Sequence, residues 1–264
     1  MTQSIDWWTI LSGGFVSYPD AEVPKAPKVS NGGLMEDVIK IFYQPTAVFD
    51  NQRNNSFVMP ALIQTLLFAV IVFSMKNLIS PFWDAESARA MAAQAAKMAA
   101  SGQAMPEGAK AMSEKIASVT AMIGPLIAPW LTAIIGGLIT WIAAKIVGAK
   151  LSYGQAATIT SWAAFPAVLA FITTAIFGMM MDPQTIRGVT DGQLGPGKFI
   201  DPNTTSRALV ALFQQMDIFS VWTFILSGIG IAVVSRASLQ TGLVGAAIKW
   251  GIIVCFSVLP AVLM

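Results

Sequence analysis

The chain has 264 residues, of which 55% are hydrophobic and only 11% are charged. A soluble domain carries about 25% charged residues, so the excess of apolar side chains requires a non-aqueous solvent. The 16 basic and 14 acidic residues form no long run of one sign, which argues against nucleic-acid binding. Histidine, the commonest general base and metal ligand, is absent. We therefore expect a membrane protein without enzyme activity, metal or cofactor.

A membrane-spanning helix needs about 20 mostly apolar residues, because its backbone must satisfy its own hydrogen bonds across the hydrocarbon core. Five stretches of the chain meet this requirement. The sequence therefore predicts an all-α integral membrane protein with five transmembrane helices in the lipid bilayer. The predicted spans lie at about residues 57–76, 125–145, 156–181, 217–235 and 243–263.

Two different segments precede the first span. Residues 1–33 carry a Trp-Trp pair and then several prolines, and we interpret them as a linker with an interfacial segment. The membrane domain should occupy residues 34–264 and begin with a short interfacial helix that stops before Pro45. On this helix the apolar side chains should form one face and the charged ones the other: Leu34, Met35, Val38, Ile39 and Phe42 against Glu36, Asp37 and Lys40.

Two longer connections should lie outside the membrane. Residues 84–118, between spans one and two, are alanine-rich and too polar to remain in the bilayer, and glycine and Pro106 interrupt their helical pattern at Ser101–Gly108. They predict an extramembrane helical hairpin. Residues 182–206, between spans three and four, contain so many glycines and prolines that they predict a connector made of turns.

Basic residues near short loops indicate the cytoplasmic side of a membrane protein. Lys145, Lys150, Arg236 and Lys249 all fall in or next to the two shortest predicted connections. With five spans, this arrangement predicts a cytoplasmic N-terminus and a C-terminus outside.

Ionisable side chains at mid-membrane usually mark ion or proton pathways. The expected span boundaries place every such residue near a span end, which disfavours a proton- or ion-coupled pump; these residues are Lys76, Lys145, Asp217, Arg236 and Lys249. Neutral polar side chains within the spans could line a path or could bond one helix to another. They are Gln64, Thr65, Thr140, Thr160, Ser161, Thr173, Thr174 and Ser227.

Asp217 and Pro166 each have two interpretations. Asp217 could cap the fourth span by accepting a hydrogen bond from the backbone N–H of Phe219 or Ser220, or it could be a titratable coupling site. Pro166 should bend the third span, either for architecture or to shape a cavity. Gly136-Gly137 and the Gly228-Ile229-Gly230 step predict close helix contacts.

Three segments resemble the Yip family of membrane proteins, named for interaction with Ypt/Rab GTPases. They are LSYGQAATITSWAAFPAVL at 151–169, QMDIFSVWTFILSGIGIAVVSRAS at 215–238 and DVIKIFYQPTAVFDNQ at 37–52. The resemblance implies a five-span fold over about residues 34–264, a cytoplasmic N-terminus and no enzyme activity. Eukaryotic members bind Rab GTPases, whereas a prokaryotic member would reside in the cytoplasmic (inner) membrane.

Four residues match the family's pattern, and the resemblance makes them candidate structural or interaction sites. They are Tyr153, Pro166, Asp217 and Trp222. The alanine-rich segment 84–118 and the Trp-Trp N-terminus depart from the eukaryotic pattern, so GTPase binding is doubtful.

The leading hypothesis is a non-catalytic scaffold or adaptor that binds other membrane protein subunits or organises lipid. The alternative is a transporter or channel subunit for a small neutral or lipid-like substrate. A dry, packed bundle would favour the scaffold, whereas a continuous wet path would favour the transporter.

Overall fold

The computed structural model describes residues 33–102 and 108–263, and all regular secondary structure within them is helical. Five helical stretches are long and apolar enough to cross a membrane, which confirms the five-span all-α prediction. The interfacial segment expected within residues 1–33 lies almost wholly outside the described residues. The α-helices are α2 (Leu34–Lys40), α3 (Pro45–Asn51), α4 (Val58–Ala100), α5 (Ala109–Leu131), α6 (Gly137–Ile146), α7 (Tyr153–Ala163), α8 (Pro166–Met180), α9 (Arg207–Gln214), α10 (Ile218–Ser235) and α11 (Leu239–Leu263).

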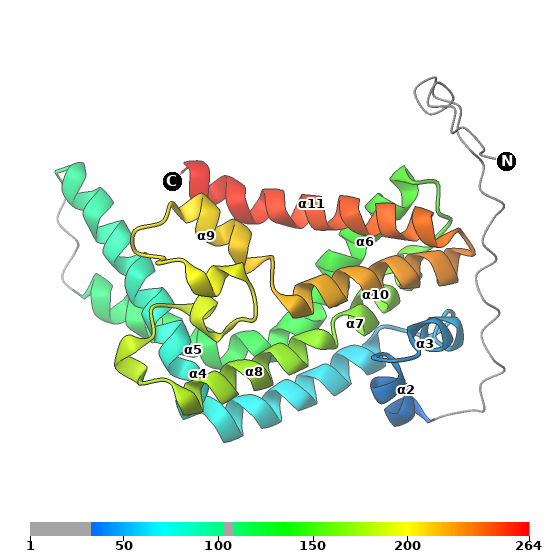
Figure 1. The fold of residues 1–264 in the computed structure, drawn as a ribbon, viewed down its shortest axis with the longest axis horizontal. Helices are drawn as coiled ribbons and strands as arrows, with labels where there is room; N and C mark the ends of the chain where they lie inside the picture. Colours follow the sequence, from blue (N-terminus) through cyan, green and yellow to red (C-terminus); the bar gives the residue numbers. More distant parts are fainter. Residues whose placement is uncertain (1–32, 103–107, 264) are drawn as a thin grey trace, which may run out of the picture.

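The spanning helices form one bundle in which α10 and α11 are an antiparallel pair (Figure 1). Helix α11 also packs against α6, while α10 packs against α3, α7 and α8. Helix α4 lies along α8 and continues into the hairpin with α5. The main hydrophobic core surrounds Trp162, Phe165, Phe49 and Leu226, all of which are fully buried.

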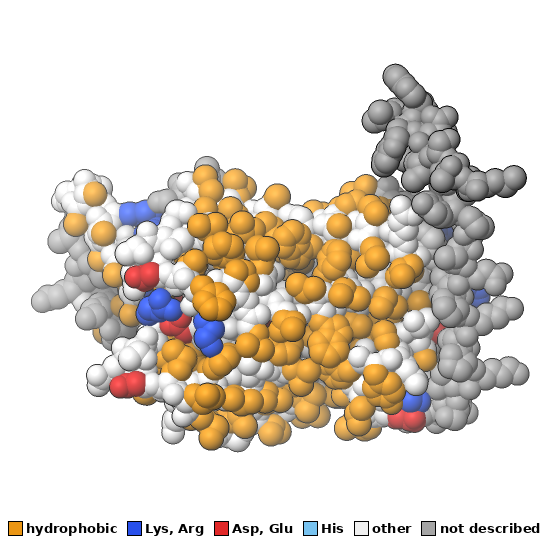
Figure 2. All heavy atoms as spheres, in the orientation of Figure 1, with side chains coloured by type: hydrophobic (Ala, Val, Ile, Leu, Met, Phe, Trp, Pro, Cys, Tyr) orange, Lys and Arg blue, Asp and Glu red, His pale blue; other side chains and the backbone are white. Residues whose placement is uncertain are grey.

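The outer surface of the bundle is apolar over its middle. Figure 2 shows hydrophobic side chains covering the central part of the visible face, with the charged side chains gathered toward the two ends. Phe73, Val221 and Phe256 are among the exposed apolar side chains of the spanning helices. A water-soluble protein would not expose so much apolar area, whereas a lipid-facing surface requires it.

Helix α4 continues well beyond the end predicted for the first span. It is 43 residues long, and its backbone leaves helical geometry at Met75, where φ is −119° and ψ is 17°. It ends at Ala100, and α5 begins after Gly108, whose φ of 86° is left-handed and favours glycine. The hairpin helices therefore extend spans one and two, and α4 ends just before the predicted break while α5 begins just after it; residues 103–107 lie outside the description.

Pro166 divides the third span into two helices. A proline has no backbone N–H and its ring clashes with the preceding turn, so α7 ends at Ala163 and α8 begins at Pro166. The single helix expected at 156–181 is therefore two helices in line. Gln64 of α4 donates from Nε2 to the Ser161 backbone oxygen at 2.6 Å, just before this break.

The two predicted faces of the short N-terminal helix do not separate into one buried face and one exposed face. Asp37 and Lys40 are buried, with exposed fractions of 2% and 8%, whereas Met35 and Ile39 are exposed. The Asp37 carboxylate accepts a hydrogen bond from Gln52 Nε2 at 2.7 Å, which offsets its burial. Leu34, Val38 and Phe42 pack against the main hydrophobic core, so α2 turns both apolar and charged side chains toward the protein.

Small residues allow the spanning helices to approach closely, as the glycine pairs predict. A Cβ on Gly137 would lie 2.7 Å from the Ala157 Cα, and a Cβ on Gly230 would lie 2.6 Å from the Ile159 side chain. Beside the first contact, the hydroxyls of Thr140 and Thr160 lie 2.7 Å apart in a buried hydrogen bond. Close approach thus joins α6 and α10 to α7.

The connector after α8 consists of short 3-10 turns, as its glycine and proline content predicts. These are η2 (Pro183–Thr185), η3 (Val189–Gly192) and η4 (Pro196–Phe199). Asp191, which is 1% exposed, holds the connector together by accepting bonds from Arg187, including one from Nη2 at 2.6 Å. This hydrogen bond raises the pKa of the Arg187 guanidinium, so that group stays charged.

Candidate functional site

A lysine lies at the middle of the fifth span, where a charge is costly. Helix α11 begins at Leu239 because Ser238 precedes it as a cap, its Oγ accepting a bond from Thr241 N at 3.1 Å. Lys249 is therefore halfway along the apolar stretch Leu239–Leu259. The prediction that Lys249 lies near a span end is wrong, because the helix starts about one turn earlier than the hydropathy indicated.

The Lys249 ammonium has a single polar partner among the described side chains. Its Nζ donates to Ser227 Oγ at 3.1 Å, and the residue is only 6% exposed. Ser227 lies halfway along α10, so the two groups meet near mid-depth of the bundle. Lys249 makes no salt bridge with any carboxylate in the described part of the chain. An ammonium in this position is expensive, and such residues usually face a polar cavity with a function.

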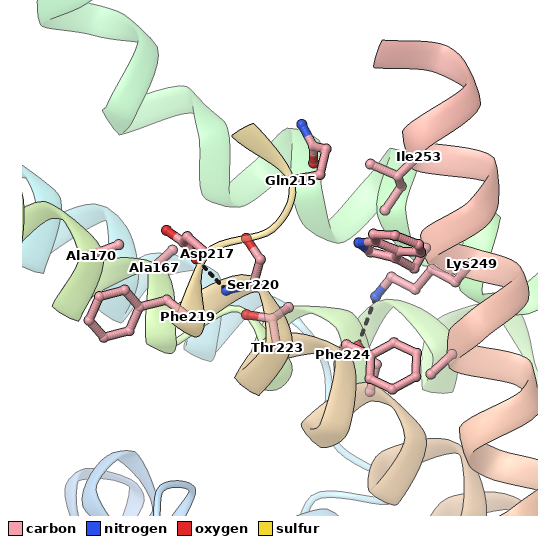
Figure 3. Close-up of a pocket in the computed structure, with 13 residues that line it drawn as sticks. Ala167, Ala170, Gln215, Asp217, Phe219, Ser220, Thr223, Phe224, Lys249 and Ile253 are labelled. Atoms are coloured by element: carbon pink, nitrogen blue, oxygen red, sulfur yellow. Dashed lines mark hydrogen bonds between the residues drawn. The ribbon is translucent and has the colours of Figure 1, made fainter. Parts of the chain in front are cut away.

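A cavity of about 190 Å³ adjoins this lysine between α8, α10 and α11 (Figure 3). Its polar side is a stripe along α10 formed by Asp217, Ser220, Thr223 and Ser227. Their spacings of three, three and four residues place them on one face of the helix. The stripe therefore leads from the start of α10 to Lys249. The apolar walls come mainly from Ala167, Ala170, Phe224, Ala246, Trp250 and Ile253.

Asp217 occupies the far end of this stripe as the N-cap of α10. Its Oδ1 accepts a hydrogen bond from Ser220 N at 2.6 Å, the contact that the capping interpretation predicts. Ten residues separate Asp217 from Ser227, which at the helical rise is about 15 Å between their Cα atoms. The carboxylate and the ammonium thus line opposite ends of the cavity and are not direct partners.

The structure does not bring the four family-derived residues together. Pro166 starts α8 next to Ala167, which lines the cavity. Tyr153 is at the other end of the third span, where its hydroxyl donates to the Ile134 backbone oxygen at 3.0 Å. Trp222 packs edge-on against Phe42 with ring centroids 5.3 Å apart. Functional roles for these residues remain predictions.

The neutral polar side chains of the spans are bonded within the protein rather than arranged as a path. Gln64 bonds to α7, Thr140 pairs with Thr160, and Thr65 donates both to its own helix and, at 3.3 Å, to the Leu126 oxygen. Of the eight predicted positions, Ser227 is the one that lines the cavity beside Lys249. Sequence reasoning missed Lys249, although the Ser238 cap was a readable sign that α11 starts earlier.

A serine hydrogen-bonded to a lysine is also an arrangement that enzymes use for nucleophilic catalysis. Acyl transfer additionally requires backbone or side-chain donors placed for an oxyanion. Ser227 lies in the interior of α10, where backbone N–H groups are engaged by the helix itself. The described residues contain no cluster of three metal-ligating side chains either. The polar groups at this cavity can form hydrogen bonds, and the Lys249 ammonium can pair with an anionic group.

Comparisons with known proteins agree with this membrane architecture. The profile of the Yip1 domain family matches residues 39–259, which include all five spans and the cavity. The membrane protein YknW of Bacillus subtilis (strain 168) is 24% identical over 147 residues, covering 54% of this chain and 61% of YknW. The alignment thus spans less than two thirds of that relative's length. No solved structure matches the chain significantly.

Proposed function

Because the chain belongs to the Yip1 domain family, whose profile covers the whole bundle, we propose that it is a non-catalytic scaffold or adaptor that binds other membrane proteins. Its similarity to a Bacillus membrane protein supports residence in a prokaryotic cytoplasmic membrane. GTPase binding is not part of this proposal, because the alanine-rich hairpin departs from the eukaryotic pattern.

The observation that carries the proposal is an unpartnered apolar stripe on helix α5. Met112, Ile116, Val119 and Ile123 recur at spacings of four, three and four residues, and their exposed fractions run from 61% to 39%. This spacing is that of a helix face that packs against another helix. Met112 and Ile116 precede the apolar stretch Ser118–Ile146, so lipid does not account for their exposure. A helix of a membrane partner fits along this stripe.

Hydrogen bonds made by polar side chains of the spanning helices support a scaffold over a channel. Polar side chains that could have lined an aqueous path instead form hydrogen bonds between or within helices. Gln64 and the Thr140–Thr160 pair are examples. A channel would need such groups to face a continuous opening. Transport of a lipid-like substrate is the alternative, and the cavity at Lys249 is the observation that favours it.

The proposed orientation places the N-terminus in the cytoplasm and the C-terminus outside. Lys249 no longer supports this orientation, because it lies inside the bundle. Lys145, Lys150 and Arg236 remain next to the two shortest connections. Arg53, which donates from Nη2 to the Val233 backbone oxygen at 3.0 Å, adds a fourth basic residue to that end.

Site-specific photocrosslinking in native cells tests the scaffold proposal. A photoreactive amino acid at position 116 should yield an adduct with one membrane protein, whereas position 256, which is 72% exposed on α11, serves as the matched lipid-facing control. Replacing Met112 and Ile116 together by Gln should lower recovery of this partner in mild detergent by at least about tenfold, the equivalent of about 1.4 kcal/mol. Equal labelling at the two positions, or unchanged recovery, would contradict the proposal.

A further inference from the structure

We propose that the cavity between α8, α10 and α11 binds the anionic headgroup of an acyl-chain lipid, a carboxylate or a phosphate, with Lys249 as its counter-ion. This site is separate from the partner surface on α5 and does not depend on the scaffold function.

No carboxylate in the described part of the chain forms a salt bridge with Lys249, which leaves its ammonium able to pair with a bound anion. The residues that line it from α8 and α11 include no acid, and the one carboxylate on α10, Asp217, caps that helix at the far end of the stripe. Ser227 accepts one hydrogen bond from the Lys249 ammonium, which has three N–H donors. Two donors remain to bind the oxygen atoms of an anion. Pairing with an anion and further hydrogen bonds would offset part of the cost of burying this cation.

The size of the cavity fits a headgroup and excludes a whole lipid. A volume of about 190 Å³ is below the roughly 300 Å³ at which pockets for drug-sized ligands begin. A carboxylate or phosphate with its first carbon atoms fills such a space. The acyl chain then remains in the surrounding bilayer.

The lining also indicates an amphiphile rather than a free inorganic ion. Ser220 and Thr223 offer hydroxyls between the start of α10 and Lys249, so a headgroup can keep hydrogen bonds as it moves inward. Facing this stripe, Ala170, Trp250 and Ile253 present apolar surface that suits the carbon chain. One polar wall and one apolar wall match the two ends of a lipid.

Binding of single-chain probes to the full-length protein tests this assignment. The protein is purified in a non-ionic detergent, stripped of lipid and titrated with decanoate, decyl phosphate, decanol or inorganic phosphate, with binding read by native mass spectrometry and by the unfolding midpoint. We expect decanoate, decyl phosphate or both to bind and raise the midpoint, and decanol and inorganic phosphate to do neither. Comparing the two anionic probes identifies the headgroup as a carboxylate, a phosphate or either.

Three variants locate the binding. Lys249→Met keeps the length of the side chain without its charge and should weaken binding of the anionic probe at least tenfold. Lys145→Met removes a lysine that lies over the Trp141 ring instead, and it should bind like the parent. Ala170→Leu narrows the cavity from α8 while keeping Lys249, so it should also weaken binding, and it decides the question if Lys249→Met does not fold.

Several outcomes would overturn the proposal. Equal binding of decanol and decanoate would show that charge is irrelevant, and unchanged affinity in both Lys249→Met and Ala170→Leu would place the lipid elsewhere. Lys249-dependent binding of inorganic phosphate at the affinity of decyl phosphate would assign the cavity to a soluble anion.

Discussion

The hydrogen bond from Gln64 to α7 should be coupled to the helix break at Pro166. At this break Phe165 N bonds to the Trp162 oxygen at 3.4 Å, which leaves the Ser161 oxygen without its usual helical donor. Gln64 Nε2 supplies a donor at 2.6 Å, and Gln64 is only 2% exposed. Gln64→Leu keeps most of the side-chain volume and removes this donor.

The expected cost of Gln64→Leu is about 1–1.5 kcal/mol in the free energy of unfolding. An unsatisfied buried polar group costs about 1–3 kcal/mol, while side-chain hydrogen bonds within membrane bundles average about 0.6 and reach about 1.7 kcal/mol. In the variant the Ser161 oxygen still accepts a weaker hydrogen bond from Ala164 N at 3.3 Å. The expected loss of stability is therefore below the upper limit for an unsatisfied buried group. The short distance and deep burial of the Gln64 bond keep the cost above the average.

Reversible unfolding in mixed detergent micelles, followed by far-UV circular dichroism, measures this cost in a double-mutant cycle with Pro166→Ala. Alanine restores a backbone N–H at position 166, so the helix can close and return a donor to the Ser161 oxygen. In that background Gln64→Leu should cost less than about 0.5 kcal/mol. Gln94→Leu, the same change at an exposed site on α4, is the control and should stay within about 0.5 kcal/mol of the parent. An equal cost of Gln64→Leu in both backgrounds would refute the coupling.

Two further predictions concern Asp217 and the topology. Asp217→Asn keeps the oxygen that caps α10 and should leave the unfolding midpoint in detergent near that of the parent, whereas Asp217→Ala should lose about 0.5–2 kcal/mol. A stable but functionally dead asparagine variant would instead indicate a titratable coupling role. An alkaline phosphatase fused after Met264 should be active and a cytoplasm-dependent reporter inactive, because the basic residues Lys145, Lys150 and Arg236 hold the opposite end in the cytoplasm. The reverse reporter pattern would invert the proposed orientation.

Features that depend on neighbouring residues could be predicted from the sequence alone. The five spans follow from run length and composition, because each helix satisfies its own backbone hydrogen bonds in lipid. The turn of the α4–α5 hairpin follows from glycine near Ser101–Gly108, and the cap at Asp217 forms within one helical turn. Gly137 and Gly230 indicated that helices pack closely at these positions. The sequence did not indicate which helix would be the neighbour.

Tertiary structure decided the features that require residues distant in the chain. Gln64 donates a hydrogen bond to the backbone oxygen of Ser161, 97 residues further along the chain. The cavity is likewise lined by residues from three helices. The inward face of α2 was unpredictable from hydropathy, because lipid and protein interior are both apolar and do not distinguish the two sides of a helix. For the same reason composition alone could not show that Lys249 faces the bundle: burial beside Ser227 depends on how α11 is rotated against α10, and packing sets that rotation.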